Sequence, residues 1–129
     1  MPLFRATPGD GAVWLTGASM GIGEVLVKLA EKGFIVYASA RSQDRLEEIS
    51  RNFSGPSKIM ALPLDVTDKT ACEAAAGRIA SENGRIGLAI FNAGTFAPVR
   101  AFKLSHDAFE QTFKLNFFGV LNCLLPAIE

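Results

Sequence analysis

The fold is decided by Thr16-Gly17-Ala18-Ser19-Met20-Gly21-Ile22-Gly23, a glycine-rich stretch between two apolar segments. Residues 12–15 before it are uniformly apolar, which predicts a buried strand. Residues 22–32, which include its last two positions, carry apolar side chains at helical spacing. The free N–H groups and the dipole at a helix N-terminus attract anions, and glycines let a phosphate approach the backbone. We therefore expect an anion-binding loop, against the alternative of a turn that merely connects.

The spacing within the loop narrows the choice of ligand. Leucine occupies the last glycine position of a G-x-G-x-x-G fingerprint, and no Lys-Ser or Lys-Thr pair follows, which argues against a triphosphate P-loop. Gly17 and Gly21 would admit a pyrophosphate, and Ser19 could donate its hydroxyl to a phosphate. Ile22 would lie at the helix N-terminus, and Gly23 would permit close packing of the helix on the strand.

The rest of the chain alternates strands and helices. Three runs rich in apolar residues predict strands at 34–39, 58–64 and 86–91. Helices are predicted at 44–53, from a cap at Thr67 or Asp68 to about residue 82, and from a cap at Ser105 to near the C-terminus. Pro63 favours an edge position for the third strand, whereas the apolar character of the fourth strand predicts a central position.

Strands that alternate with helices predict a parallel sheet. The expected fold class is α/β: a three-layer doubly wound parallel sheet of the Rossmann-like type, with strand order 3-2-1-4 and incomplete at the C-terminus. Residues 1–129 form a single domain in this interpretation. The glycine loop would then lie at the carboxyl edge of the sheet, where such folds bind ligands.

Charge and cysteine content exclude several classes of function. The 13 Lys and Arg residues balance 13 Asp and Glu residues, so no overall field attracts nucleic acid or an anionic membrane. Cys72 and Cys123 lie in apolar helical patterns and predict reduced thiols, which indicates a cytoplasmic protein. The N-terminus lacks the apolar core of a signal peptide, and no apolar run reaches membrane-spanning length. We expect no metal site.

Four motifs follow one another along the chain. They are T-G-x-x-x-G-x-G at residues 16–23, Asp65-Val66, Asn92-Ala93-Gly94 and, in the last predicted helix, Asn116. In this order they resemble the N-terminal part of the short-chain dehydrogenase/reductase family, and they span nearly the whole chain. The resemblance implies an NAD(P)-dependent oxidoreductase that transfers a hydride between the cofactor and a carbonyl or alcohol substrate. This chain would be its cofactor-binding part.

The resemblance assigns the adenine end of the cofactor to Asp65 and Val66. Asp65 would accept a hydrogen bond from the adenine amino group, and Val66 would pack on the ring. The alternative for Asp65 is a local helix-capping carboxylate. Asn92 would tie its turn to the neighbouring strands, while Ala93 and Gly94 would leave room for a ribose. Alternatively, Gly94 is a plain turn glycine that contacts no ligand.

Arg41 indicates which cofactor is bound. It follows Gly21 by twenty residues and ends the second predicted strand, where an acidic residue would bind a ribose 2′-hydroxyl and exclude a 2′-phosphate. A guanidinium instead offers several donors to a phosphate, so NADP is favoured over NAD. Met20 in the glycine loop adds no second cation. The alternative is a solvated arginine at a helix start.

Two polar residues of the last predicted helix are further candidates. Asn116 lies between Phe113 and Phe117, and a buried amide must be hydrogen-bonded. It is either a satisfied structural asparagine or, as the resemblance implies, a catalytic support residue that holds a water in a proton relay. His106 could act as a general base, but it lies in a polar helix start with no nucleophile beside it. We expect a surface histidine.

The catalytic tyrosine and lysine of the family have no match in this chain. Its only tyrosine, Tyr37, lies inside a predicted strand and is followed four residues on by Arg41 rather than lysine. We expect a fragment of a longer reductase, truncated before the catalytic Ser and Tyr-x-x-x-Lys. The alternative is a non-catalytic nucleotide-binding or interaction module. The last helix has two apolar faces, one for the sheet and one for a missing segment or another subunit, so a homo-oligomer through this helix is expected.

Overall fold

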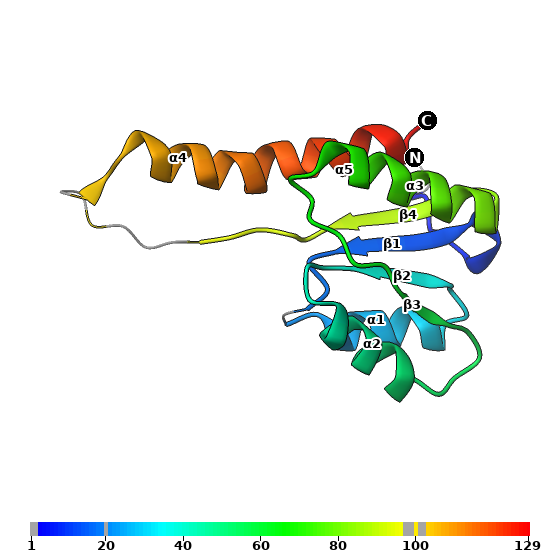
Figure 1. Cartoon of the computed structure of the whole chain (residues 1–129). Coiled ribbons are helices and arrows are strands. Elements are labelled where there is room, and N and C mark those ends of the chain that lie inside the picture. Colours follow the sequence, from blue (N-terminus) through cyan, green and yellow to red (C-terminus); the bar gives the residue numbers. More distant parts are fainter. Residues whose placement is uncertain (1–2, 20, 97–99, 101–102) are drawn as a thin grey trace.

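Four parallel strands form one sheet in the computed structural model of the chain, which describes residues 3–19, 21–96, 100 and 103–129 (Figure 1). The strands are β1 (Ala12–Thr16), β2 (Val36–Ser39), β3 (Ile59–Ala61) and β4 (Ile86–Phe91). Their order is β3-β2-β1-β4, and each neighbouring pair is parallel. The predicted strand order and the Rossmann-like fold class are confirmed.

Helices cover both faces of this sheet. A short 3-10 helix, η1 (Pro8–Asp10), precedes β1. One face carries α1 (Gly23–Glu31) and α2 (Gln43–Asn52), and the other carries α3 (Lys69–Asn83) and α5 (Gly119–Ala127) (Figure 1). Successive side chains of a strand point to opposite faces. Val13 and Leu15 therefore enter the core beneath α1 and α2, whereas Trp14 enters the core beneath α3 and α5.

The last helix is continuous but not uniform. It runs as α4 (His106–Phe113), a π-helical turn η3 (Lys114–Phe118), and α5. The Ser105 side chain caps α4, as predicted, by accepting from the Ala108 N–H. In the π turn the Gly119 N–H donates to the Lys114 carbonyl, five residues back. Helical spacing in the sequence did not predict this turn.

β4 is the last strand of the described sheet, in the place that the predicted order 3-2-1-4 gives it, and the central position predicted from its apolar sequence is not found within this chain. Its one strand neighbour among the described residues is β1, and all six of its residues are only half-buried. An apolar run predicts burial but does not identify the neighbours that provide it. In Figure 1, α4 extends beyond the end of the sheet, and Phe109 and Phe113 are 52% and 57% exposed. The second apolar face predicted for the last helix is therefore present and solvent-exposed.

Cys72 and Cys123 face each other between α3 and α5. Both thiols are free and buried, with their Sγ atoms 3.6 Å apart. Burial raises the pKa of both thiols, so they pack as small hydrophobic groups, as predicted. Within the part of the chain that the structure describes, no helix has both the length and the apolar character needed to cross a bilayer.

Candidate cofactor site

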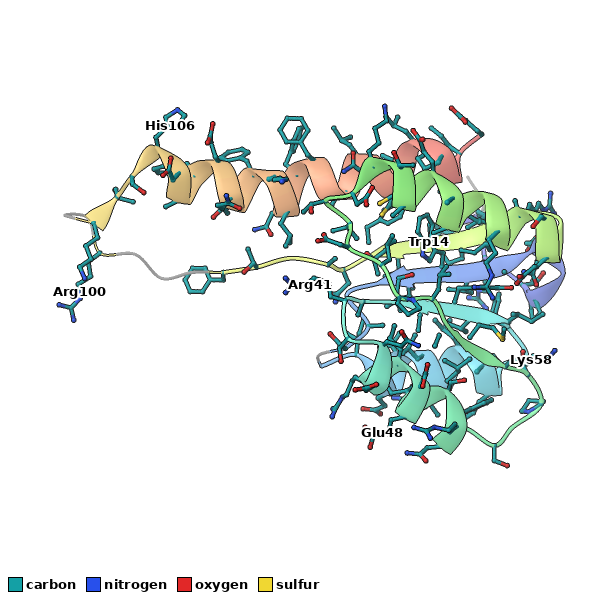
Figure 2. The ribbon with its side chains drawn as sticks, in the orientation of Figure 1. Trp14, Arg41, Glu48, Lys58, Arg100 and His106 are labelled. Atoms are coloured by element: carbon teal, nitrogen blue, oxygen red, sulfur yellow. The ribbon has the colours of Figure 1, made fainter. Side chains whose placement is uncertain are left out.

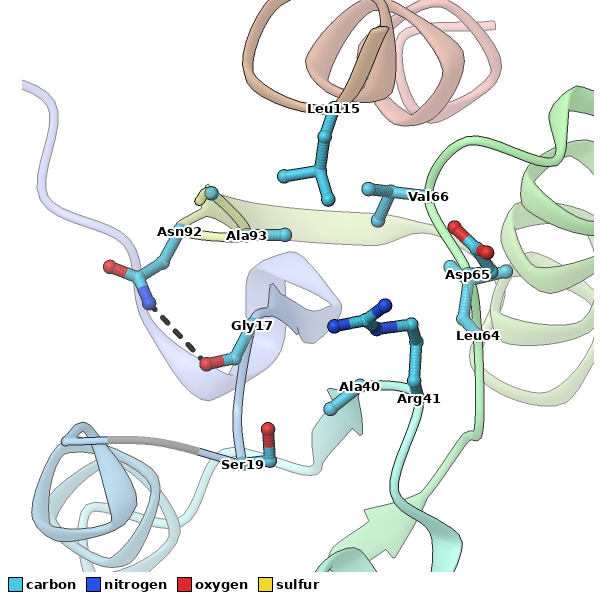
Figure 3. Close-up of a pocket in the computed structure, with 11 residues that line it drawn as sticks. Gly17, Ser19, Ala40, Arg41, Leu64, Asp65, Val66, Asn92, Ala93 and Leu115 are labelled. Atoms are coloured by element: carbon cyan, nitrogen blue, oxygen red, sulfur yellow. Dashed lines mark hydrogen bonds between the residues drawn. The ribbon is translucent and has the colours of Figure 1, made fainter. Parts of the chain in front are cut away.

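A pocket of about 180 Å³ opens at the carboxyl edge of the sheet (Figure 3). The residues of its lining that the sequence predicted are Gly17, Ser19, Arg41, Asp65, Val66, Asn92, Ala93 and Gly94. They belong to the loops that follow β1, β2, β3 and β4. The parallel topology therefore brings together motifs that lie far apart in the sequence.

Gly17 lies where the loop after β1 meets the loop after β4. Its backbone is left-handed, with φ +72°, and a Cβ on it would lie 2.7 Å from the Ala93 nitrogen. The Asn92 side-chain amide donates to the Gly17 carbonyl over 3.4 Å, and the Ala93 N–H donates to Thr16 Oγ1 over 3.3 Å. The tie predicted for Asn92 is present, and these contacts fix one wall of the pocket.

The N-terminus of α1 begins directly after the glycine loop. Gly21 is exposed and left-handed, with φ +75°, and no described atom lies within 4 Å of a Cβ placed on it. Ile22 is the cap residue of α1, as predicted, and neither residue is part of the pocket lining. The close packing predicted for Gly23 is wrong, because its Cβ position also has no described atom within 4 Å. Met20 lies outside the described residues.

Arg41 and Asp65 bring opposite charges to the pocket. Figure 3 shows the Arg41 side chain directed into the pocket from the end of β2. Asp65 Oδ1 accepts from the N–H and the hydroxyl of Thr67, over 2.9 and 2.8 Å. These bonds, and to a smaller extent the charges of Arg41 and Lys114, hold the pKa of Asp65 below its ordinary value. Because the cap of α3 is Asp68, the helix-capping alternative for Asp65 is wrong.

The sequence did not single out Ala40, Leu64 and Leu115, which complete the lining. Leu64 directly precedes Asp65, and Leu115 directly precedes Asn116. Their positions next to motif residues were the signal in the sequence that could have identified these two leucines. They supply apolar surface against which a flat ring could pack.

Asn116 contacts the loop after β4 and does not line the pocket. Its Oδ1 accepts from the Thr95 N–H over 2.7 Å, and its Nδ2 donates to the Thr95 carbonyl over 2.8 Å. Asn116 is exposed and not buried between phenylalanines as the sequence predicted, because this part of the last helix extends past the end of the sheet. The paired bonds make Asn116 a clamp on this loop. Its part in a proton relay stays a prediction.

Tyr37 lies outside the pocket. Its hydroxyl donates to the Glu82 carboxylate and accepts from the Asn83 side-chain amide over 2.9 Å. Glu82 and Asn83 end α3, just before the amino end of β4, so this cluster lies at the edge of the sheet opposite the pocket. Burial, followed by the bond to Glu82, raises the pKa of the phenol. Tyr37 is a structural residue.

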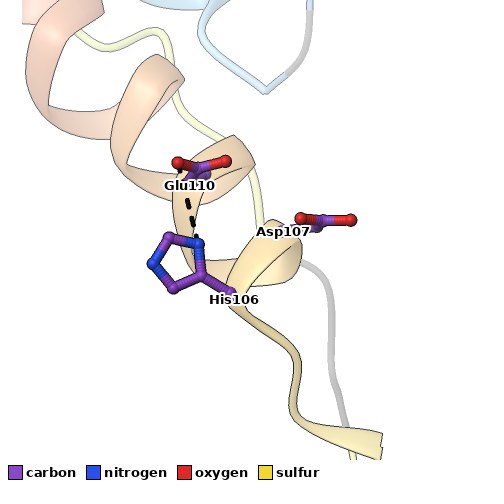
Figure 4. A group of neighbouring side chains, drawn as sticks. All are labelled: His106, Asp107 and Glu110. Carbon is purple, nitrogen blue, oxygen red and sulfur yellow. Dashed lines mark ion pairs between the residues drawn. The ribbon is translucent and has the colours of Figure 1, made fainter.

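His106 is a surface residue, as predicted. Figure 2 shows it near the free tip of α4, where the helix extends past the end of the sheet at which Arg41 lies. Its Nδ1 lies 3.7 Å from Glu110 Oε1, one turn along the helix, and Asp107 is its neighbour (Figure 4). All three side chains are exposed, and such groups at a helix start are ordinarily solvated. His106 is not among the described residues that line the pocket.

Comparison with known proteins gives one consistent result. Residues 11–129 match the family model for short chain dehydrogenases. The chain is 36% identical over 126 residues to the Mus musculus protein "Dehydrogenase/reductase SDR family member 7", with 91% of this chain and 37% of the relative covered. It is 31% identical over 133 residues to an NADPH-dependent pterin aldehyde reductase of Arabidopsis thaliana, with 95% of this chain and 55% of the relative covered.

A solved structure agrees with these relatives. The alcohol dehydrogenase of Thermococcus sibiricus, complexed with 5-hydroxy-NADP, superposes with a TM-score of 0.81 at 30% identity. The match covers 91% of this chain and 52% of that one. The chain thus spans about half the length, or less, of the relatives that it matches.

Proposed function

Because the chain belongs to the short-chain dehydrogenase/reductase family, we propose that it forms the NADP(H)-binding part of an oxidoreductase acting on a small carbonyl or alcohol substrate. The observation that carries the proposal is the pocket in which the loops after all four strands meet. Loops at this edge of a doubly wound sheet are where such folds hold nucleotides.

The residues of the pocket fit a dinucleotide. Gly17 lines the pocket, and at Gly21 the space that a Cβ would fill is open, so a phosphate could approach the backbone of the first loop next to the N-terminus of α1. Leu64, Val66 and Leu115 would pack against the adenine, and the ionised Asp65 would accept from its amino group. The turn Asn92-Ala93-Gly94 would hold a ribose. The roles of Asp65, Val66 and the Asn92-Ala93-Gly94 turn are those expected from the sequence, whereas Leu64 and Leu115 are added by the lining of the pocket.

Arg41 supports NADP as the cofactor. It ends β2 beside Ala40, takes part in none of the ion pairs formed among the described residues, and directs its guanidinium into the pocket. A guanidinium can bind the 2′-phosphate of NADP with paired charge-assisted hydrogen bonds. The relative from Arabidopsis thaliana is named as NADPH-dependent, and the structure from Thermococcus sibiricus holds an NADP derivative.

The bound nicotinamide supplies or accepts the hydride, and the residues of this chain bind and orient the dinucleotide. The acid/base step belongs to residues elsewhere in a longer polypeptide, a serine and a Tyr-x-x-x-Lys pair, because Tyr37 is the only tyrosine here and is bonded to Glu82 and Asn83. Asn116 would support that step by clamping Thr95. Self-association would use the exposed phenylalanines of the last helix.

The experiment is a titration of the chain with NADPH and NADH, followed by nicotinamide fluorescence, for the wild type and two charge-reversal variants. Arg41→Asp should weaken NADPH binding about tenfold or more and leave NADH binding unchanged or tighter, because one or two charge-assisted bonds are lost. Arg51→Asp, which makes the same change of charge in the last turn of α2, should preserve the wild-type preference. An unchanged preference in Arg41→Asp would refute the choice of NADP, and no binding by the wild type would refute the proposal.

A further inference from the structure

Three groups of the helices α3 and α5 lie close to Val66. A Cβ on Gly119, in the first turn of α5, would lie 2.8 Å from Val66 Cγ2 and 3.6 Å from the Val66 carbonyl oxygen. The Asn122 side-chain amide, one turn further along, donates to that carbonyl over 2.9 Å. The Cys72 thiol of α3 lies 3.6 Å from the same oxygen. Val66 is 6% exposed, so it is enclosed by these groups and the pocket.

These contacts matter because Val66 belongs to no helix or strand. It lies in the turn between β3 and α3, where no hydrogen bonds of a helix or a strand hold its backbone in place. Close-packed interiors leave no room for an added methyl group. A side chain that such a methyl group pushes must therefore move into open space. For Val66 the open space is the pocket. Val66 forms part of the pocket wall together with Leu115, which lies in η3 of the last helix.

We propose that Gly119 and Asn122 are positioning residues of the cofactor site, which set the place of Val66 as a wall of the adenine end of the pocket. Gly119 lets the last helix approach Val66 as closely as a backbone allows, and Asn122 holds the Val66 carbonyl. The last helix thereby determines the width of the pocket without contacting the ligand through either residue. The inference rests on the proposed function, because it requires that the pocket bind an adenine nucleotide.

The probe is adenosine 2′,5′-bisphosphate, which presents the adenine and the 2′-phosphate without the nicotinamide half. Its affinity for the chain is measured by isothermal titration calorimetry in Gly119→Ala and in Gly77→Ala. Both glycines lie inside helices, but a Cβ on Gly77 meets no described atom within 4 Å. Gly77→Ala should bind as the wild type does, and Gly119→Ala should bind about tenfold or more weakly because its methyl displaces Val66.

A double-mutant cycle separates positioning from a general loss of structure. Val66→Ala removes the methyl that the new Cβ would strike, so adding Gly119→Ala in that background should change the affinity by less than about twofold. An equal loss in both backgrounds would mean general damage and would overturn the proposal, as would wild-type affinity in Gly119→Ala.

A second variant covers the case in which Gly119→Ala does not fold. Asn122→Ala removes only the donor to the Val66 carbonyl and should also weaken binding, by a smaller factor, with a cooperative thermal transition retained. Wild-type affinity in a folded Asn122→Ala would then overturn the proposal. Failure of the wild-type chain to bind the probe would instead overturn the proposed function, together with the inference that rests on it.

Discussion

Replacement of Gly17 by alanine should destabilise the fold through two separable effects. The left-handed φ of +72° costs an L-residue about 1 to 2 kcal/mol. The new Cβ would also lie 2.7 Å from the Ala93 nitrogen and 2.8 Å from its Cα, and these are backbone atoms that cannot rotate away. Overpacking of this kind costs about 1 to 3 kcal/mol more. The expected loss for Gly17→Ala is therefore about 2 to 5 kcal/mol.

Gly21→Ala is the matched control. Its φ of +75° carries the same conformational cost, but no described atom lies within 4 Å of the new methyl. The expected loss is about 1 to 2 kcal/mol. Urea unfolding followed by Trp14 fluorescence measures both free energies, since Trp14 is the only tryptophan and is buried. Equal losses in the two variants would refute the conclusion that contact with the loop after β4 is what requires glycine at position 17.

Two further substitutions test contacts outside the glycine loop. Tyr37→Phe should lower the free energy of unfolding by about 1 kcal/mol at neutral pH. Because the folded-state pKa of Tyr37 is raised, this contribution is present below the pKa of free tyrosine and is lost as the pH rises through the folded-state pKa. Because Tyr37 is the only tyrosine, a pH titration followed by tyrosinate absorbance reports on it alone. A titration midpoint at or below that of free tyrosine would contradict the hydrogen-bonded cluster with Glu82 and Asn83. Asn116→Asp keeps the acceptor for the Thr95 N–H but sets a carboxylate oxygen against the Thr95 carbonyl, so stability measured by urea unfolding should fall by about 1 to 3 kcal/mol at neutral pH. The loss should shrink in acid, where the introduced carboxyl group can again donate, and a loss independent of pH would refute the paired bonds.

The sequence predicted the order of the sheet and most of the pocket because both follow from short-range patterns. Glycine spacing, apolar periodicity and the polar residues after each strand are local, and the parallel topology then places every strand end at one edge. Gly17, Arg41 and Asn92 could be assigned to one site for this reason. Their residue types also determine their chemistry. A positive charge from Arg41 at the end of the second strand could therefore be predicted without knowing how the side chains pack.

Contacts between distant segments were not predictable in this way. The reason for glycine at position 17 is the Ala93 backbone, whereas Gly23 has open space where close packing was expected. The spacing of the glycines in the sequence predicts neither of these two environments. The predicted order 3-2-1-4 already places β4 at the end of this sheet, so the apolar run alone was what suggested a central strand. Asn116 is exposed because the helix that carries it extends past the sheet.

The last helix has a larger part in the pocket than its single motif residue suggested. Leu115 lines the pocket, Asn116 clamps the loop after β4, and Gly119 supports Val66 in the loop after β3. A π turn covers residues 114–118 and so includes the first two of these residues, and such turns shift the face that a helix presents. One short helical segment therefore holds two of the four loops that form the pocket. A force that displaces this segment, including one applied to its exposed phenylalanines, must move both loops with it.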